Sequence, residues 1–185
     1  MVGDAGGVRR LTAFGGTART VWAADAALTK VWTPVGIPSL ELFELEPTME
    51  NASAFADLIA KARVAHKFGM SVTLYPVADY AGMRLFVTEN GASGFALKPN
   101  GDIISGFSSG GNAVASMLEA AVAAGGTKLD AYDTVLPEMY ASHGFRAVAR
   151  VKWDDAEAPE GWDKALYREF NGGESDVVLM VYDPE

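Results

Sequence analysis

The stretch that decides the fold is Asp102-Ile103-Ile104-Ser105-Gly106-Phe107-Ser108-Ser109-Gly110-Gly111-Asn112-Ala113-Val114, at residues 102–114. Its first half, residues 102–107, is rich in branched and aromatic residues and predicts a strand. A loop of small residues follows at 108–112. The alanine-rich run 113–122 then predicts a helix that ends at Gly125-Gly126. The chain therefore passes from strand to helix through a glycine-containing turn.

Such a turn leaves backbone N–H groups unpaired and pointing at one place. Together with the helix dipole, these groups can hold a phosphate or pyrophosphate, although an ordinary strand-to-helix turn with two glycines has the same sequence. The Gly-Lys-Ser/Thr of a P-loop is absent, and so is the third glycine of a dinucleotide-binding fingerprint. Residues 108–113 are thus a candidate anion site of neither type.

Upstream of this stretch, turn residues predict antiparallel strands. Asn90-Gly91 is a strong hairpin signal because both positions tolerate positive φ. Pro99-Asn100-Gly101 forms a second turn, so the last three of these strands make an antiparallel meander. The predicted strands cover residues 71–75, 84–88, 93–97 and 102–107.

The N-terminal part divides into an extension, residues 1–38, and the start of a domain that covers residues 39–185. Within the extension, 1–16 reads as a flexible arm, and 17–31 as a helix with Trp22 and Trp32 as packing anchors. Pro34 and Pro38 close it.

The domain begins with a strand at 40–45. A helix follows, capped by Asn51 or Ser53 and stopped at Gly69. Downstream of the central stretch we expect a strand at 128–132, a short helix at 136–142, a strand at 145–153, a solvated acidic loop at 154–163 and a strand at 177–182.

The composition excludes several kinds of chemistry. The 185 residues carry 15 Lys and Arg against 24 Asp and Glu, a formal charge of −9. The chain is long enough to fold without a disulfide or metal. It has no Cys, which excludes disulfides, thiolate metal ligands and a cysteine nucleophile. His66 and His143 are the two histidines, both expected at helix ends near the surface, so no metal site is expected.

The same composition bears on partners and location. Acidity argues against general nucleic-acid or anionic-membrane binding, because both require an excess of cationic side chains. No signal peptide is apparent, and no stretch approaches the roughly 20 apolar residues of a membrane span. We therefore expect a soluble, cytoplasmic protein without membrane partners.

A second informative region lies downstream. The strand Leu129-Asp130-Ala131-Tyr132-Asp133 is followed by Met139-Tyr140-Ala141-Ser142-His143-Gly144-Phe145, in which Tyr-x-x-x-Gly-Phe ends a short helix. With the loop at 108–113, this order resembles the GNAT superfamily of acyl-coenzyme A N-acyltransferases. The resemblance runs from about Leu40 to Tyr182 and is strongest over Gly94–Trp153. The chain is also similar to GNAT-like proteins encoded by bacteriophages, which would place it in the host cytoplasm.

The resemblance implies an α/β (α+β) fold with a mixed, mostly antiparallel sheet that is splayed between its fourth and fifth strands and flanked by helices. It also implies acetyl-CoA or CoA as the cofactor. Tyr140 would protonate the departing thiolate, since the ordinary pKa of a phenol is about 10. A core aromatic with a satisfied hydroxyl is the alternative for this residue. The backbone of Ile104, Ser105, Gly106 and Phe107 would pair with the pantetheine amides, and Ser108, Ser109, Gly110, Gly111, Asn112 and Ala113 would cradle the pyrophosphate.

The loop departs from the family pattern, which normally places Arg or Gln before Gly-x-Gly or Gly-x-Ala. Residues 108–114 contain no basic side chain, and the nearest lysine upstream is Lys98. Backbone amides would then have to bind the phosphates alone. The alternatives are that the fold has lost the cofactor or that it uses another acyl donor.

An amine nucleophile must lose a proton before attack, so a general base is expected near the thioester. Asp130, within the strand that would face the thioester, is preferred; if it were buried there, it would need a partner. Glu89 lies at an exposed hairpin tip, and Asp102 begins the strand before the loop. Asp133 is expected to cap the short helix that starts at Leu136.

The sequence therefore predicts an acyl-CoA-dependent N-acyltransferase, acting on a primary amine of a small molecule or protein by direct transfer, and it allows a homodimer. One alternative is a non-catalytic GNAT-like binding or inhibitory module of phage origin. A second is a GNAT-like enzyme that modifies a nucleic-acid base or an aminoacyl-tRNA, which would require Arg9, Arg10, Arg19 and Lys30 to gather on one face.

Overall fold

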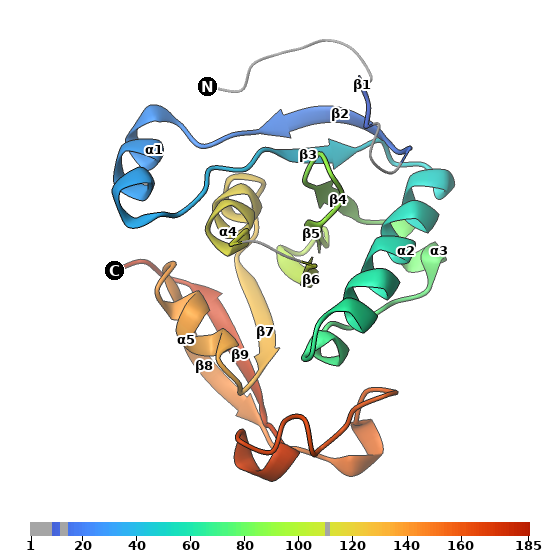
Figure 1. The fold of residues 1–185 in the computed structure, drawn as a ribbon, viewed down its shortest axis with the longest axis vertical. Coiled ribbons are helices and arrows are strands. Elements are labelled where there is room, and N and C mark those ends of the chain that lie inside the picture. The colour runs from blue at the N-terminus through green and yellow to red at the C-terminus, as the bar shows by residue number, and fades with distance from the viewer. Residues whose placement is uncertain (1–8, 12–14, 110–111) are drawn as a thin grey trace.

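The computed structural model describes residues 9–11, 15–109 and 112–185. These residues form a mixed α/β fold with a nine-stranded, mostly antiparallel sheet and five α-helices (Figure 1). The strands are β1 (Arg9–Arg10), β2 (Thr17–Trp22), β3 (Leu42–Leu45), β4 (Arg84–Val87), β5 (Ser93–Leu97), β6 (Asp102–Ser108), β7 (Lys128–Tyr132), β8 (Phe145–Val151) and β9 (Val177–Tyr182). The helices are α1 (Ala26–Trp32), α2 (Met49–Ala65), α3 (Val77–Ala81), α4 (Val114–Ala123) and α5 (Leu136–Ala141), with 3-10 turns η1 (Thr33–Val35), η2 (Gly69–Ser71), η3 (Asp155–Glu157) and η4 (Asn171–Gly173).

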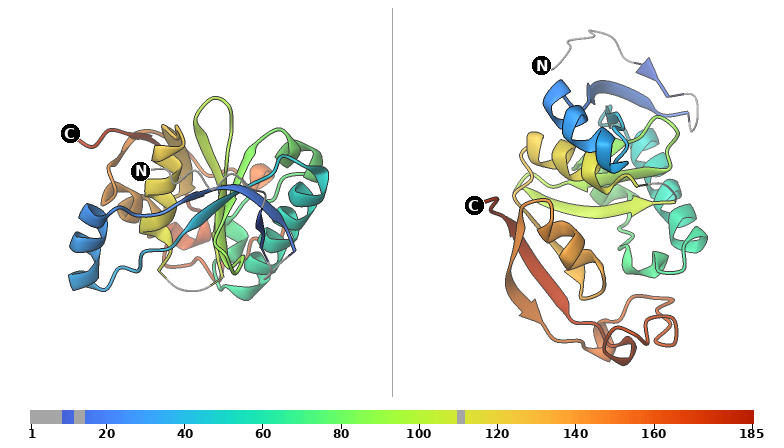
Figure 2. Two further views of the ribbon diagram at one scale, coloured as in Figure 1. Left: turned by 90° about the horizontal axis from the view of Figure 1, so that it is seen from above. Right: turned by 60° about the vertical axis from the view of Figure 1, so that its left-hand side comes forward.

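Two apolar cores lie on opposite faces of the sheet. Alternate side chains of a strand point to opposite faces, so Leu85 and Val87 of β4 join the core under α2 and α3, whereas Phe86 joins the core under α4. Figures 1 and 2 show α2 and α4 on opposite sides of the central strands. The predicted elements at 84–88, 93–97, 102–107, 113–122, 128–132, 136–142, 145–153 and 177–182 are all present, within a few residues of their expected ends.

The prediction of one helix over residues 17–31 is wrong. Residues 17–22 form β2, which pairs antiparallel with β3, and α1 begins only at Ala26. β-branched residues in Thr17-Ala18-Arg19-Thr20-Val21-Trp22 favour a strand. The Asp25 side chain accepts a hydrogen bond from the Leu28 N–H and so fixes the start of α1. Residues 1–8 and 12–14 of the expected arm lie outside the described residues.

The predicted cap of α2 is also wrong. The helix starts at Met49, and Thr48 is its N-cap, because the Thr48 hydroxyl accepts from the Asn51 N–H at 3.1 Å. The Asn51 side chain is buried instead and donates to the Thr17 and Glu46 carbonyls at 3.0 and 2.9 Å. Asn51 therefore holds α2 against β2, a role that its spacing along the helix does not reveal.

Residues 71–75 do not form the predicted strand. Ser71 ends η2, residues 72–75 run on toward α3, and side chains bind two of their main-chain groups. The Tyr80 hydroxyl accepts from the Tyr75 N–H at 3.0 Å, and the Ser105 hydroxyl donates to the Thr73 carbonyl at 2.9 Å. The Tyr80 and Ser105 hydroxyls make hydrogen bonds that a neighbouring strand would otherwise make. Residues 72–75 therefore lie beside β6 without forming a strand of the sheet.

The sheet parts between β6 and β7, the fourth and fifth strands counted from β3. In the described chain these parallel strands pair only at Asp102 with Lys128 and at Ile103 with Leu129. Beyond these two pairs, β6 continues to Ser108 and β7 to Tyr132 without further pairing. On the far side of β7, β9 lies between β7 and β8 and pairs with both.

The buried carboxylate of Glu44 joins several elements of the first half of the sheet. Arg84 donates to both carboxylate oxygens, at 2.7 and 3.1 Å, and Arg19 of β2 donates at 3.2 Å. The Arg84 guanidinium also donates to the Ala124 carbonyl at the end of α4, at 2.8 Å. Since Glu44 lies in β3, one buried charge ties β2, β3, β4 and α4 together.

We expect Arg84→Met to lower the free energy of unfolding by about 2 kcal/mol, because it removes charge-assisted hydrogen bonds from a buried carboxylate. Arg146→Met is the matched control, since Arg146 makes a similar bond, 2.8 Å to Asp183, at the surface. Its cost should stay below about 1 kcal/mol. Urea denaturation of the three proteins tests this, and equal losses in the two variants would contradict it.

Candidate functional site

A cavity of about 390 Å³ opens where β6 and β7 part. One wall is β6 from Ile103 to Ser108, and the opposite wall is α5 with residues 129–131 of β7. Residues 69–75 and the first turns of α4 close its sides. The residues expected to hold pantetheine, 104–107, and the two expected to act chemically, Tyr140 and Asp130, all line this cavity.

A β-bulge shapes the β6 wall. Gly94 pairs with Phe107 and Ala96 with Ile104, so Ser105 and Gly106 together stand opposite the single residue Phe95. Ser105 adopts a φ of +50°, which is strained for a residue with a side chain. Its hydroxyl contacts the Tyr80 hydroxyl at 2.8 Å and donates to the Thr73 carbonyl. These bonds hold the bulge in place at the cavity wall.

The loop after β6 offers less to an anion than the sequence suggests. The Ser109 N–H and hydroxyl both donate to the Ala92 carbonyl, at 2.7 and 3.0 Å, so Ser109 is bound to the β4–β5 connection. Ser108 contacts Ser93 through their hydroxyls at 2.9 Å. Asn112 is exposed, and Ala113, at the N-cap of α4, has no side-chain acceptor for the first N–H groups of the helix. Gly110 and Gly111 lie outside the described residues.

Tyr140 of α5 forms part of the cavity wall. Its hydroxyl makes no hydrogen bond with any described residue, so its expected alternative role, a core aromatic with a satisfied hydroxyl, does not describe it. Burial, followed by the nearby Asp130 charge, raises the pKa of Tyr140 to about 12. The phenol is therefore neutral at physiological pH and can donate a hydrogen bond to a ligand in the cavity.

Asp130 faces the cavity from β7. Its neighbours Leu129 and Ala131 are buried, and Leu129 belongs to the core under α4, so Asp130 points to the other face, where it is exposed. It makes no hydrogen bond or ion pair with any described residue. Desolvation, then the nearby Asp102 carboxylate, raises the pKa of Asp130, and Lys98 opposes this shift. The carboxylate is thus an unpartnered, partly desolvated base beside the cavity.

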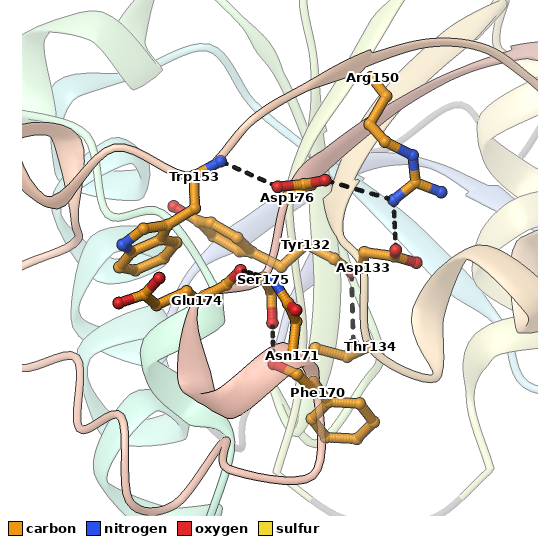
Figure 3. A network of polar contacts seen from close by, with 10 residues as sticks. All are labelled: Tyr132, Asp133, Thr134, Arg150, Trp153, Phe170, Asn171, Glu174, Ser175 and Asp176. Carbon is orange, nitrogen blue, oxygen red and sulfur yellow. Dashed lines mark hydrogen bonds and ion pairs between the residues drawn. The ribbon is translucent and has the colours of Figure 1, made fainter.

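Asp133 does not cap α5 as expected. It forms an ion pair with Arg150, which also lies 3.9 Å from Asp176 (Figure 3). The α5 N-cap position is Val135, which has no side-chain acceptor. Asp133 is therefore bound to Arg150 of β8, and this ion pair makes it a poor candidate for the general base.

The two histidines lie near the ends of helices. His66 is exposed and borders the cavity, where its Nδ1 accepts from the Phe68 N–H at 3.1 Å. His143 is half-buried, and this burial lowers its pKa. In the described part of the chain, no three His, Asp or Glu side chains gather as metal ligands would, and no helix is both long and apolar enough to cross a bilayer.

A further wall of the site was not apparent from the sequence. Residues 153–176, which we call the acidic-aromatic segment, connect β8 to β9. Its Trp162 ring stacks on Tyr167 with centroids 3.8 Å apart, and Tyr167 in turn packs on Phe68 at 5.1 Å. Phe170 lines the cavity. The expected solvated loop at 154–163 is exposed at its acidic side chains, but Trp162 is half-buried. Four aromatic residues in 24 positions were the signal that distinguishes this segment from a solvated loop.

We expect Asp130→Asn to raise the melting temperature at pH 7, because it removes a charge that the folded state disfavours. Because the pKa of Asp130 is raised in the folded state, the ionised carboxylate lowers the free energy of unfolding above that pKa. It has no effect at a pH where the carboxyl is protonated in both the folded and the unfolded state. The gain should therefore disappear below the ordinary carboxyl pKa of about 4. Thermal unfolding at several pH values tests this, with Asp57→Asn on exposed α2 as the control. A lower melting temperature at pH 7 would show that Asp130 has a stabilising partner.

Comparisons with known proteins identify no relative. No protein-family model matches the chain, and neither the curated proteins nor the solved structures contain a significant match. The function assigned to the chain therefore has to come from its own residues and geometry.

Proposed function

We propose that this chain is a GNAT-like N-acyltransferase that transfers an acyl group, most simply acetyl, from coenzyme A to a primary amine by direct attack. The observation that carries the proposal is the cavity at the parting of β6 and β7. Its lining includes Tyr140 and Asp130, whose polar side-chain groups have no partner among the described residues, together with the irregular backbone of the β6 bulge. These are the groups that the sequence resemblance assigns to such an enzyme.

The cofactor would lie along β6. The bulged backbone at Ser105 and Gly106 is not paired one-to-one with β5, so its polar groups are suited to the amides of a pantetheine arm. The pyrophosphate would lie at the start of α4, where the helix dipole and uncapped N–H groups favour an anion. Ser109 is already bound to Ala92, so it would contribute little to this site.

Two side chains would carry out the proton transfers of the reaction. Asp130 would accept the proton that the amine loses as its nitrogen bonds to the thioester carbonyl carbon. Tyr140 would donate a proton to the sulfur as the carbon–sulfur bond breaks, and would regain one relayed from solvent. The products are an amide and a free thiol. A phenol with a pKa of about 12 stays protonated until charge develops on the sulfur.

A specific observation favours the alternative of a non-catalytic binding module. No Lys or Arg is found among the described residues that line the cavity, and residues 108–113 contain none. Coenzyme A carries several phosphates that usually require such a partner. The nucleic-acid alternative is less well supported, because Arg19, one of the four cations it requires, is paired with Glu44.

Titration calorimetry with acetyl-CoA tests the proposal. We expect saturable binding, and absence of binding at millimolar acetyl-CoA would overturn it. Binding without thiol release in the presence of mixed mono- and diamines would instead support the binding module.

Tyr140→Phe should lower turnover about 100-fold while leaving acetyl-CoA affinity nearly unchanged, because it removes the proton donor and keeps the ring. Thiol release measures the turnover, and calorimetry measures the affinity. Tyr182→Phe, which removes a phenol hydroxyl outside the cavity, is the matched control and should leave both values unchanged. Loss of affinity in Tyr140→Phe would show that Tyr140 supports the binding wall instead.

A further inference from the structure

The acidic-aromatic segment borders the cavity through Phe170. It leaves β8, runs toward the C-terminal end of α2, and returns to β9 (Figures 1 and 2). Arg63 of α2 donates to the Glu160 carbonyl at 3.2 Å, and Phe68 packs against both Tyr167 and Phe170. A molecule that enters the cavity from this side therefore passes the segment.

Most of the chain's net negative charge lies in this segment. Residues 153–176 contain eight carboxylates and two basic side chains, so they account for −6 of the formal −9. Three of the carboxylates pair with Lys164 or Arg150. The other five make no ion pair with any described residue: Asp154, Glu157, Glu160, Asp163 and Glu169. A concentration of unpaired charge in a segment that borders a cavity attracts cations toward that segment.

The segment already holds one alkylammonium group, which belongs to the chain itself. The Lys164 Nζ lies 2.6 Å from Asp155 and 2.8 Å from Glu174, and it stands 5.9 Å from the centre of the Trp153 ring. Two carboxylates and an indole face are a combination that binds alkylammonium ions. The segment is therefore chemically suited to a second group of the same kind.

The cavity itself presents groups of matching character. Asp130 is its one lining carboxylate among the described residues, and its lining includes no Lys or Arg. Tyr140, which is half-buried, has a hydroxyl that makes no hydrogen bond with any described residue, and Tyr75 adds an aromatic ring. A carboxylate-bearing acceptor would find no cation to pair with here. An ammonium group would find Asp130.

Asp130 and the segment are linked by Tyr132. Both residues point to the same face of β7, about 7 Å apart along the strand. The Tyr132 ring packs against Trp162 and Trp153, with centroids at 4.8 and 6.3 Å. A flexible alkyl chain anchored at Asp130 can thus run beside aromatic rings toward the unpaired carboxylates.

We infer that the acceptor is a small linear polyamine, whose reacting amine lies at Asp130 and whose further ammonium groups lie against the acidic-aromatic segment. This inference rests on the proposed acyl transfer for the identity of the reaction, but the binding it describes does not require coenzyme A.

Calorimetry with spermidine and with n-butylamine, each in the absence and presence of acetyl-CoA, tests the inference. We expect spermidine to bind at least about tenfold more tightly than n-butylamine at low salt, since its further charges meet several carboxylates. The difference should shrink at high ionic strength. Equal affinities would overturn the inference, and so would tighter binding of an oligolysine peptide, which would identify a protein acceptor.

Two sets of charge variants locate the binding. Glu157→Gln/Glu160→Gln/Glu169→Gln should weaken spermidine about tenfold and leave n-butylamine nearly unchanged. The control Glu41→Gln/Glu50→Gln/Asp57→Asn removes three exposed carboxylates elsewhere and the same total charge, and it should have little effect. Equal effects of the two triple variants would show that net charge alone attracts the ligand, and would overturn the assignment.

Asp130→Asn should weaken both amines, because both place an ammonium group there. If spermidine binds and acetyl-CoA does not, the proposed transfer fails while the polyamine site stands. If acetyl-CoA binds and spermidine behaves like n-butylamine, the transfer stands and the polyamine inference fails.

Discussion

The two residue pairs that join β6 to β7 are the constraint on which the rest of the structure depends. In the described chain they are all that makes one sheet of β1–β6 and β7–β9. Parallel strands need a crossover, and α4 provides it on one face. Beyond those pairs, β6 and β7 diverge, and neither strand has a paired neighbour on the side that faces the other. Their facing polar groups have to be satisfied in other ways or left for a ligand.

The protein meets this constraint with side chains from distant parts of the sequence. Ser105 and Tyr80 bind residues 73–75 beside β6 in place of a neighbouring strand. At the other end, the aromatic rings of residues 153–176 pack from β7 across to Phe68. The walls of the gap are thus built, while Tyr140 and Asp130 within it keep no partner among the described residues. Polar groups that are left without a partner in such a wall are available to a ligand.

Local signals in the sequence were sufficient for most of the fold. Turn residues such as Asn90-Gly91, and the change of hydrophobic period after residue 107, placed the meander, α4 and β7 correctly. The wrong predictions concern residues whose conformation or contacts depend on a partner far away in the sequence. The pairing with β3 makes residues 17–22 a strand, hydroxyl groups of Tyr80 and Ser105 replace a strand at 71–75, and Arg150 takes Asp133 away from α5. For the candidate site, the order of motifs along the chain pointed to Tyr140, Asp130 and residues 104–107, all of which line the cavity. The acidic-aromatic segment was not, because its contacts with Phe68 span about a hundred residues.

The position of β8 has a consequence for how the protein behaves at high concentration. β8 ends the described sheet, and an exposed edge strand is a template for addition of another chain. Its register is interrupted between Ala147 and Ala149, and Arg146 and Arg150 on either side of that bulge hold ion pairs with Asp183 and Asp133. A strand from a second molecule would meet an irregular ladder and would have to desolvate two guanidinium groups. The β8 edge is therefore protected against pairing with a strand of a second molecule. The sheet can remain open between β6 and β7 without becoming prone to aggregate at this edge.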